Sequence, residues 1–310
     1  MNSNLGAALM IVSAQACTIF NIGIKTGAAQ NLIATDFMQK AFGHNIAWGD
    51  WFVAALPFTV IMSVVLFVLS LWLLRPQVPA RGQAEEMLRR QLAEMGPMTG
   101  SEKRLTALAL VLLVLWATEG KLHPIDSTSA MVMGVALLLM PGIGVLHWKT
   151  AEPLIPWGTI VLFAIGISLG TLLSRTGAAT WLASATLGHL GLGTLSAVGV
   201  IAALSAFNIV LHLGFASATG LASTLIPVMI AFAQQLPPST GSAFGIVLIQ
   251  QFVVSFGMIL PMNAPQNMLC YGTGAFETRT FALIGLPLTV AGYLLILALS
   301  ATVWPAMGVL

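Results

Sequence analysis

Two short stretches of the chain match each other, and each interrupts a long apolar segment. The first reads Ala29-Gln30-Asn31-Leu32-Ile33; the second, about 236 positions later, reads Pro265-Gln266-Asn267-Met268-Leu269. A further matching pair follows them, Leu56-Pro57-Phe58-Thr59-Val60 and Leu286-Pro287-Leu288-Thr289-Val290. Paired interruptions at corresponding places predict an internal repeat whose apolar helices are broken at the same point.

The composition predicts that these segments lie in a membrane. Hydrophobic residues make up 57% of the chain and charged residues only 7%, with a mean hydropathy of +0.93. A soluble protein carries about 25% charged residues. Apolar runs of helix length predict an all-α polytopic membrane protein with the lipid bilayer as its surroundings. A net charge of +2 gives no support for binding nucleic acid.

The apolar runs give the expected order of segments. The polar stretch 75–104 contains one amphipathic helix, 84–95, and 178–187 is a short surface segment. Two broken helices are expected, one at 5–43 with halves 5–24 and 32–43, and one at 243–276 whose first half is 243–262. Ordinary spans are expected at 51–74, 105–118, 128–146, 157–174 and 280–304.

Residues 193–235 differ from an ordinary pair of spans. Two apolar arms flank the small and hydroxyl residues Phe215-Ala216-Ser217-Ala218-Thr219-Gly220. Each arm of about 15–20 residues is marginal for crossing a hydrocarbon layer of about 30 Å. A re-entrant hairpin with its tip at Ser217–Thr219 is therefore predicted.

Lysine and arginine in the loops predict the orientation. The cytoplasmic side would hold the residues Arg75, Arg81, Arg89, Arg90, Lys103, Arg104, Lys149 and Arg279, against Lys40, Lys121 and Arg175 outside. The N-terminus is then cytoplasmic and the C-terminus external. The two broken helices run in opposite directions, as in an inverted-topology repeat.

This order predicts three parts. Residues 1–74 hold the last two spans of a first inverted repeat, 75–104 form a cytoplasmic loop, and 105–310 form a complete second repeat. An unwound turn in a membrane helix is tolerated only beside water, protein or a ligand. The paired breaks therefore predict the binding site of a secondary transporter.

Hydroxyl and amide side chains near the breaks suit such a site. They donate hydrogen bonds to an anion, helix N-termini favour negative charge, and exposed oxygens can ligate sodium. The predicted substrate-binding residues are Thr26, Asn31, Ser217, Thr219 and Asn267. The predicted sodium ligands are Gly27, Ser217, Thr219 and Ala264. The alternative interpretation is that these small residues only pack helices closely.

Three further polar features are less specific. Lys25, beside the first break, either meets a substrate charge, occupies a cation position, or extends to water. His212 either hydrogen-bonds the hairpin tip or packs as a neutral ring. Glu119 is expected in a solvated loop. No nucleotide-binding, metalloprotease or serine-hydrolase motif is present, so no enzymatic activity is predicted.

The chain resembles the divalent anion:sodium symporter family. Lys25 to Asn31 and Met262 to Asn267 resemble its two broken helices, and Ser217-Ala218-Thr219 stands where its second Ser-Asn-Thr motif belongs. The resemblance implies an inner-membrane homodimer that carries a di- or tricarboxylate, or a similar divalent anion. It also implies sodium coupling and elevator-type alternating access.

Three departures leave alternatives open. The spans and hairpin that precede the first broken helix in the family are missing, so we expect a truncated product. Ala218 replaces the asparagine of the motif, and Gln30 and Gln266 stand where the family often has proline, which would soften the turn. A sodium-independent anion exchanger, or a non-transporting remnant or accessory subunit, therefore remains as an alternative to symport.

Overall fold

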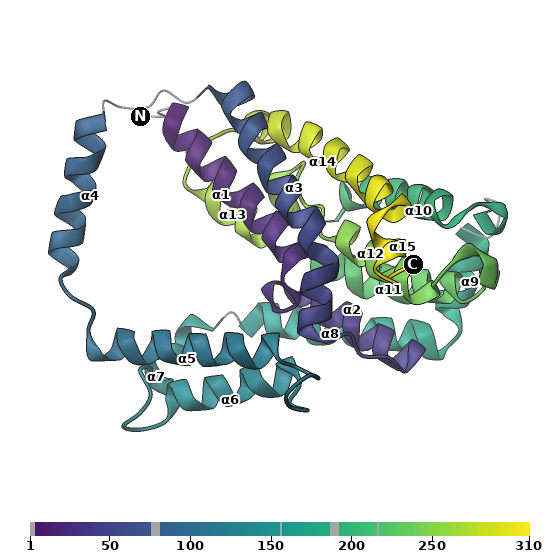
Figure 1. Cartoon of the computed structure of the whole chain (residues 1–310), viewed down its shortest axis with the longest axis horizontal. Helices are drawn as coiled ribbons and strands as arrows, with labels where there is room; N and C mark the ends of the chain where they lie inside the picture. The colour runs from purple at the N-terminus through teal and green to yellow at the C-terminus, as the bar shows by residue number, and fades with distance from the viewer. Residues whose placement is uncertain (1–3, 76–80, 156, 187–191, 216) are drawn as a thin grey trace. The chain divides into compact units, whose positions relative to one another are not determined.

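The computed structural model describes residues 4–75, 81–155, 157–186, 192–215 and 217–310 (Figure 1). This part of the chain is helical and contains no β-strand; a single bridge joins Glu119 and His123. The predicted all-α class is confirmed. Of the predicted features, Ala216 at the hairpin tip, 76–80 in the polar loop and Leu187 lie outside the described residues.

The chain divides into two compact units. The first comprises residues 1–46, 50–75 and 161–310, and the second comprises 47–49 and 76–160. Both broken helices and the predicted hairpin belong to the first unit, which therefore contains all the predicted binding residues.

Three helices in the described part of the chain are long and apolar enough to cross a membrane: Leu5–Gly23, Trp48–Leu74 and Thr278–Ala306. They correspond to α1 (Asn4–Gly23), α3 (Trp48–Leu74), and α14 (Thr278–Ala301) with α15 (Val303–Ala306). The sequence predicted all three. Buried tryptophans join them, because the indole N–H groups of Trp51 and Trp304 donate to the Ile22 and Ala54 carbonyls at 2.9 and 2.8 Å.

The two broken helices are built alike. The first is α1, the 3-10 turn η1 (Lys25–Gly27) and α2 (Ala29–Phe42); the second is α12 (Ala243–Val254), η6 (Pro261–Asn263) and α13 (Pro265–Gly272). Helix α1 packs along α13, and α12 packs against α2 (Figure 1). The first half of each broken helix thus lies against the second half of the other, which is the arrangement that an inverted repeat requires.

Helix α12 is shorter than predicted. It ends at Val254 instead of continuing to about 262, and residues 255–260 are irregular. Gly257 and the proline at 261 explain the difference, because glycine weakens a helix and the residue before a proline is disfavoured in helical conformation.

The elements that precede α12 along the chain are α8 (Trp157–Arg175), α9 (Ala178–Thr186), η4 (Leu192–Thr194), α10 (Ala197–His212), α11 (Ala218–Ala233) and η5 (Pro238–Thr240). Helix α10 packs on α12 and α14, while α11 packs on α2, α9 and α12. Their connection at 213–217 corresponds to the predicted hairpin tip. Whether the pair re-enters the membrane stays a prediction.

The second unit contains α4 (Arg81–Met95), α5 (Gly100–Ala117), α6 (Ser127–Leu139), α7 (Trp148–Ala151) and η2 (Glu152–Leu154). Helix α5 packs against α6. The predicted solvation of Glu119 is wrong. Its buried carboxylate accepts from the Trp48 N–H at 2.7 Å and from the Ser127 hydroxyl at 2.6 Å, because these groups satisfy the charge that burial would otherwise destabilise.

Candidate functional site

The backbone takes the same path through both breaks. Ile24 and Leu260 are extended before the 3-10 turn, with φ of −119° and −118°. Ala28 and Ala264 are extended after it, with φ, ψ of −148°, 141° and −147°, 144°. Each break is therefore a single turn of 3-10 helix between two extended residues, and the second reproduces the first.

A buried asparagine closes each break. The side-chain N–H of Asn31 donates to the Asn21 carbonyl at 2.7 Å, and that of Asn267 donates to the Gly257 carbonyl at 2.6 Å. Both bonds reach back ten residues, from the first turn of the following helix across the break. An unpaired buried carbonyl costs about 1–3 kcal/mol, so these bonds offset the free energy that each break would otherwise cost.

Two glutamines at equivalent positions connect the repeats. Gln15 on α1 donates to the Met258 carbonyl before the second break at 2.8 Å. Gln251 on α12 donates to the side-chain oxygen of Asn31 in the first break at 3.1 Å. The helix of each repeat therefore supports the break of the other.

A second pair of glutamines strengthens this exchange. The side chain of Gln30 donates to the Ser255 hydroxyl at 3.4 Å, and that of Gln266 donates to the Thr18 hydroxyl at 3.0 Å. The sequence suggested that glutamine in place of proline would soften the turn. In the structure both glutamines bind the opposite repeat.

The α10–α11 connection contacts the second break, and the start of α11 contacts the start of α2. Asn263 donates to the carbonyls of His212 and Phe215 at 2.8 and 2.9 Å, while its side-chain oxygen accepts from the Leu260 N–H. On the other side, the Thr219 hydroxyl donates to the Gln30 side-chain oxygen at 3.5 Å. The residues on either side of the predicted tip therefore lie between the second break and the start of α2.

The other predicted residues lie around this junction. Thr26 and Gly27 lie in η1, where Gly27 is exposed, and Ala264 is buried at the start of α13. Ser217 is half-buried, and its hydroxyl oxygen accepts from the Gly220 N–H as the N-cap of α11. Asn31 and Asn267 differ from the expectation of open donors, because backbone carbonyls occupy their N–H groups.

The N-termini of α2 and α13 differ from those of their neighbours. Serine side chains cap α10, α11 and α12, whereas Ala28 and Ala264 at the starts of α2 and α13 provide no side-chain cap within the described structure. The first N–H groups of a helix lack intrahelical partners and carry a partial positive charge. The two breaks therefore present uncapped positive helix ends beside the tip.

Lys25 and His212 are both buried in the structure. The Lys25 ammonium donates to the Ile46 carbonyl at 2.7 Å, so it does not extend to water in this state. Neither ring nitrogen of His212 has a hydrogen-bond partner among the described residues, which matches the packed interpretation. Only the backbone carbonyl of His212 takes part in the junction.

The sequence alone did not reveal that Gln15 and Gln251 connect the repeats. Their signal was present in the register, because the spacing that matches Asn31 with Asn267 also matches Gln15 with Gln251. Only the antiparallel packing reveals that each partner belongs to the opposite repeat.

Comparison with known proteins agrees with this architecture. The family described as Sodium:sulfate symporter transmembrane region matches residues 1–310. Broken helices, an antiparallel repeat and membrane-length spans describe a helical membrane transporter, and the chain belongs to this family. The family is one of transporters, which confirms the prediction that the protein is not an enzyme.

Named relatives cover nearly all of the chain. A protein called "Membrane protein" from Cupriavidus necator is 47% identical over 306 residues, which are 99% of this chain and 60% of the relative. Two proteins called L-tartrate/succinate antiporter, from Escherichia coli strain K12 and Shigella dysenteriae serotype 1, are 28% identical over 97% of this chain. The chain spans about 60% of the length of these relatives.

Proposed function

We propose that the chain takes part in secondary transport of a small divalent anion, a dicarboxylate, across the inner membrane. The observation that carries the proposal is the junction of two equivalent breaks with the α10–α11 connection. A binding site formed where two inverted repeats meet can be opened alternately to either side of the membrane. An elevator-type movement of such a site within a homodimer belongs to the same proposal.

The uncapped starts of α2 and α13 support an anionic substrate. Two positive helix ends next to hydroxyl and amide groups favour a ligand that carries two negative charges. The proposed substrate contacts are Thr26, Asn31, Ser217, Thr219 and Asn267. For Asn31 and Asn267 the contact requires that the substrate replaces the bond that each side-chain N–H now makes to a backbone carbonyl.

A dianion in a membrane needs positive charge, and two sources are available. Sodium could be held by oxygens at the predicted positions Gly27, Ser217, Thr219 and Ala264, as the description of the family suggests. Lys25 supplies a buried ammonium in the first break without any ion. The relatives named antiporters, together with Lys25 and Ala218, favour exchange of two dicarboxylates as the second candidate.

Uptake of radiolabelled succinate into proteoliposomes distinguishes these modes. Symport predicts uptake driven by an inward sodium gradient, whereas exchange predicts uptake that ignores sodium and requires dicarboxylate inside. Tartrate is tested as competitor because of the names of the relatives. Absence of uptake under every gradient would contradict transport by this chain and favour an accessory or non-transporting role.

Substitutions at the junction test the site itself. Asn267→Ala should abolish the protection that succinate gives against thermal unfolding. Asn208→Leu is the matched control, because Asn208 is a buried amide on α10 that donates to the Gln250 carbonyl of α12 and to no residue of the breaks. It should lower stability but keep succinate protection. Normal protection in Asn267→Ala would remove this residue from the proposed site.

The proposed sodium site has its own test. Ser217→Ala should weaken the sodium dependence of uptake while leaving the amount of folded protein nearly unchanged. A change confined to expression would instead support a packing role for Ser217.

A further inference from the structure

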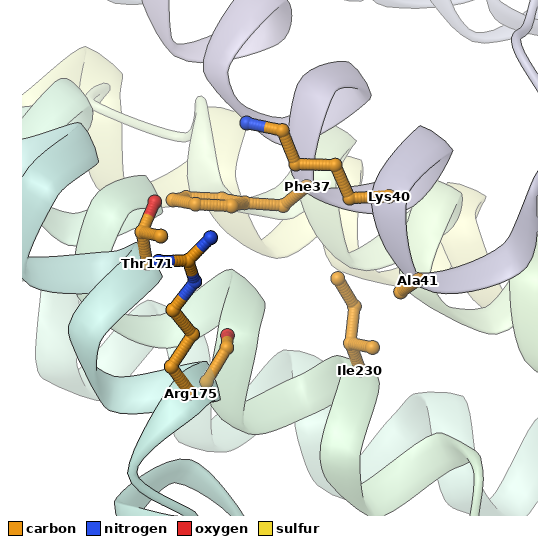
Figure 2. Close-up of a pocket in the computed structure, with 7 residues that line it drawn as sticks. Phe37, Lys40, Ala41, Thr171, Arg175 and Ile230 are labelled. Atoms are coloured by element: carbon orange, nitrogen blue, oxygen red, sulfur yellow. The ribbon is translucent and has the colours of Figure 1, made fainter.

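A cavity lies between α2, α8 and α11 of the first unit, lined by none of the break residues. It has a volume of about 430 Å³ and is lined by Phe37, Lys40, Ala41, Thr171, Ser174, Arg175 and Ile230 (Figure 2). Such a volume lies within the range of small-molecule sites. Close helix packing builds its wall, because a Cβ on Gly170 of α8 would overlap the Phe37 ring and the Ser223 carbonyl oxygen.

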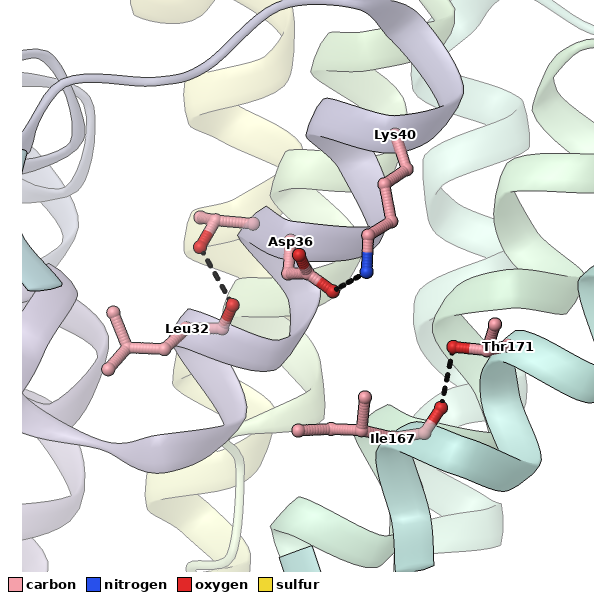
Figure 3. A network of polar contacts seen from close by, with 6 residues as sticks. Leu32, Asp36, Lys40, Ile167 and Thr171 are labelled. Atoms are coloured by element: carbon pink, nitrogen blue, oxygen red, sulfur yellow. Dashed lines mark hydrogen bonds and ion pairs between the residues drawn. The ribbon is translucent and has the colours of Figure 1, made fainter. Parts of the chain in front are cut away.

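Two cationic residues line this cavity from different helices. Arg175 ends α8, and its guanidinium has no ion pair or hydrogen bond to any described residue. Lys40, in the last turn of α2, pairs with Asp36 at 2.6 Å (Figure 3). That pair is exposed and spaced i, i+4, so it contributes little and can be exchanged for another anion. The three charges together leave the cavity positive.

The hydroxyl groups of the cavity are not equivalent. Thr171 donates to the Ile167 carbonyl of its own helix at 2.8 Å (Figure 3), so its proton is already used. Ser174 makes no side-chain hydrogen bond to a described residue. The donors left for a ligand are therefore the Arg175 fork, the Ser174 hydroxyl and, after exchange with Asp36, the Lys40 ammonium. Such a set suits a tetrahedral oxyanion such as phosphate.

The remaining wall is apolar. Phe37, Ala41 and Ile230 form it, and the side chains of Phe37 and Ile230 are buried. Charged side chains at the ends of apolar membrane helices lie at the level of lipid headgroups. The distribution of lysine and arginine predicted that Lys40 and Arg175 lie on the same side of the membrane. In the structure both residues line the same cavity.

We propose that this cavity binds the phosphate group of an anionic membrane phospholipid, with its glycerol and upper acyl chain against Phe37 and Ile230. A free inorganic anion would use the cationic rim but leave the apolar wall unmatched. The assignment is independent of the transported substrate, because none of the lining residues belongs to the breaks or to the α10–α11 connection.

Native mass spectrometry of the purified full chain in mild detergent tests the proposal. Phosphatidylglycerol is titrated as the probe, with phosphatidylcholine and inorganic phosphate as comparison ligands. The wild-type chain should retain phosphatidylglycerol in preference to phosphatidylcholine. Arg175→Gln should weaken retention roughly tenfold through loss of a charge-assisted contact. Asp36→Asn should strengthen retention, because it releases Lys40.

Two variants control for charge and folding. Lys121→Gln removes one exposed positive charge elsewhere and should leave lipid retention unchanged. Arg175→Lys keeps the charge and should restore part of the retention that Arg175→Gln loses. Unchanged retention in the double variant K40Q/R175Q would overturn the site. Displacement of phosphatidylglycerol by millimolar inorganic phosphate would overturn the lipid assignment and indicate a site for free oxyanions.

Discussion

The first and second breaks share a backbone but differ in the side chains that they present. Both have a 3-10 turn between two extended residues, and both are closed by an asparagine that reaches back ten residues. At the last position of the turn the first break has Gly27 and the second has Asn263. Asn263 binds two carbonyls of the α10–α11 connection, whereas Gly27 has no side chain to do so. The same fold therefore holds one break to a neighbouring segment and leaves the other without that connection.

The first position of the turn differs as well. Lys25 occupies it in the first break and Pro261 in the second. The proline needs no acceptor and ends any approaching helix, which explains the irregular residues 255–260. The lysine allows α1 to continue to Gly23 and places a buried charge beside the break. The comparison indicates that the backbone path is symmetric whereas the charge is not.

The largest effect is expected from the residue that separates the two breaks. Asn263→Ala would remove three hydrogen bonds, those to the His212 and Phe215 carbonyls and that from the Leu260 N–H, so it should lower the free energy of unfolding by about 3 kcal/mol. Gly27→Ala should cost about 0.5 kcal/mol, because the nearest atom to its Cβ would be in the Ile24 side chain at 3.2 Å. Unfolding in mixed micelles measures both changes. Equal losses would show that the contacts of Asn263 do not distinguish the breaks.

Helix packing behind the breaks should give the next largest effect. A Cβ on Gly285 of α14 would overlap the Met258 carbonyl oxygen, which also accepts from Gln15. Gly285→Ala should therefore destabilise the protein by about 2 kcal/mol. The equivalent position of the first repeat is already Ala55, which is fully buried. The reverse change Ala55→Gly is the control and should cost only about 1 kcal/mol. An unaffected Gly285→Ala variant would contradict the close approach.

The reciprocal glutamines test whether the breaks depend on each other. Gln15→Leu and Gln251→Leu each remove one hydrogen bond to the opposite repeat and should each cost about 1 kcal/mol. Because the two positions are equivalent, their losses should be similar in the same micelle titration. A loss confined to one variant would mean that only one break relies on its partner.

The hydroxyl partners should show effects no larger than those of the glutamines. Thr18→Val removes the 3.0 Å acceptor of Gln266 and should cost about 1 kcal/mol. Ser255→Ala removes the longer 3.4 Å contact with Gln30 and should cost about 0.5 kcal/mol. The ratio of the two losses is the measurement of interest. A larger loss for Ser255→Ala would reverse the assigned order of the contacts.

Much of the helical order could be predicted from apolar length alone. Spans at 5–24, 51–74 and 280–304 followed from uninterrupted hydrophobic runs, which only a helix can carry through lipid. The end of α12 could not be predicted in this way, because the apolar run continues past Val254. The helix ends at Val254 because Gly257 and Pro261 disfavour its continuation. The burial of Glu119 was missed because its partners, Trp48 and Ser127, are distant or unremarkable in sequence.

The candidate site was predictable in position more than in detail. The matching sequences located both breaks and the serine–threonine tip, since polar residues in an apolar run need a reason to be there. They did not show that the side-chain N–H groups of Asn31 and Asn267 donate to backbone carbonyls. They also gave no indication that Lys40 and Arg175, about 135 positions apart, line one cavity.

By itself the sequence determined that this chain is a helical membrane protein with a duplicated broken helix, because the length of an apolar run and a repeated sequence can both be measured along the chain. Only the tertiary structure decided which hydrogen-bond donor pairs with which acceptor. Gln15 serves the second break and Gln251 the first only because the repeats pack antiparallel. Hydrogen-bond partners are chosen by distance in space, and that distance exists only once the helices have packed.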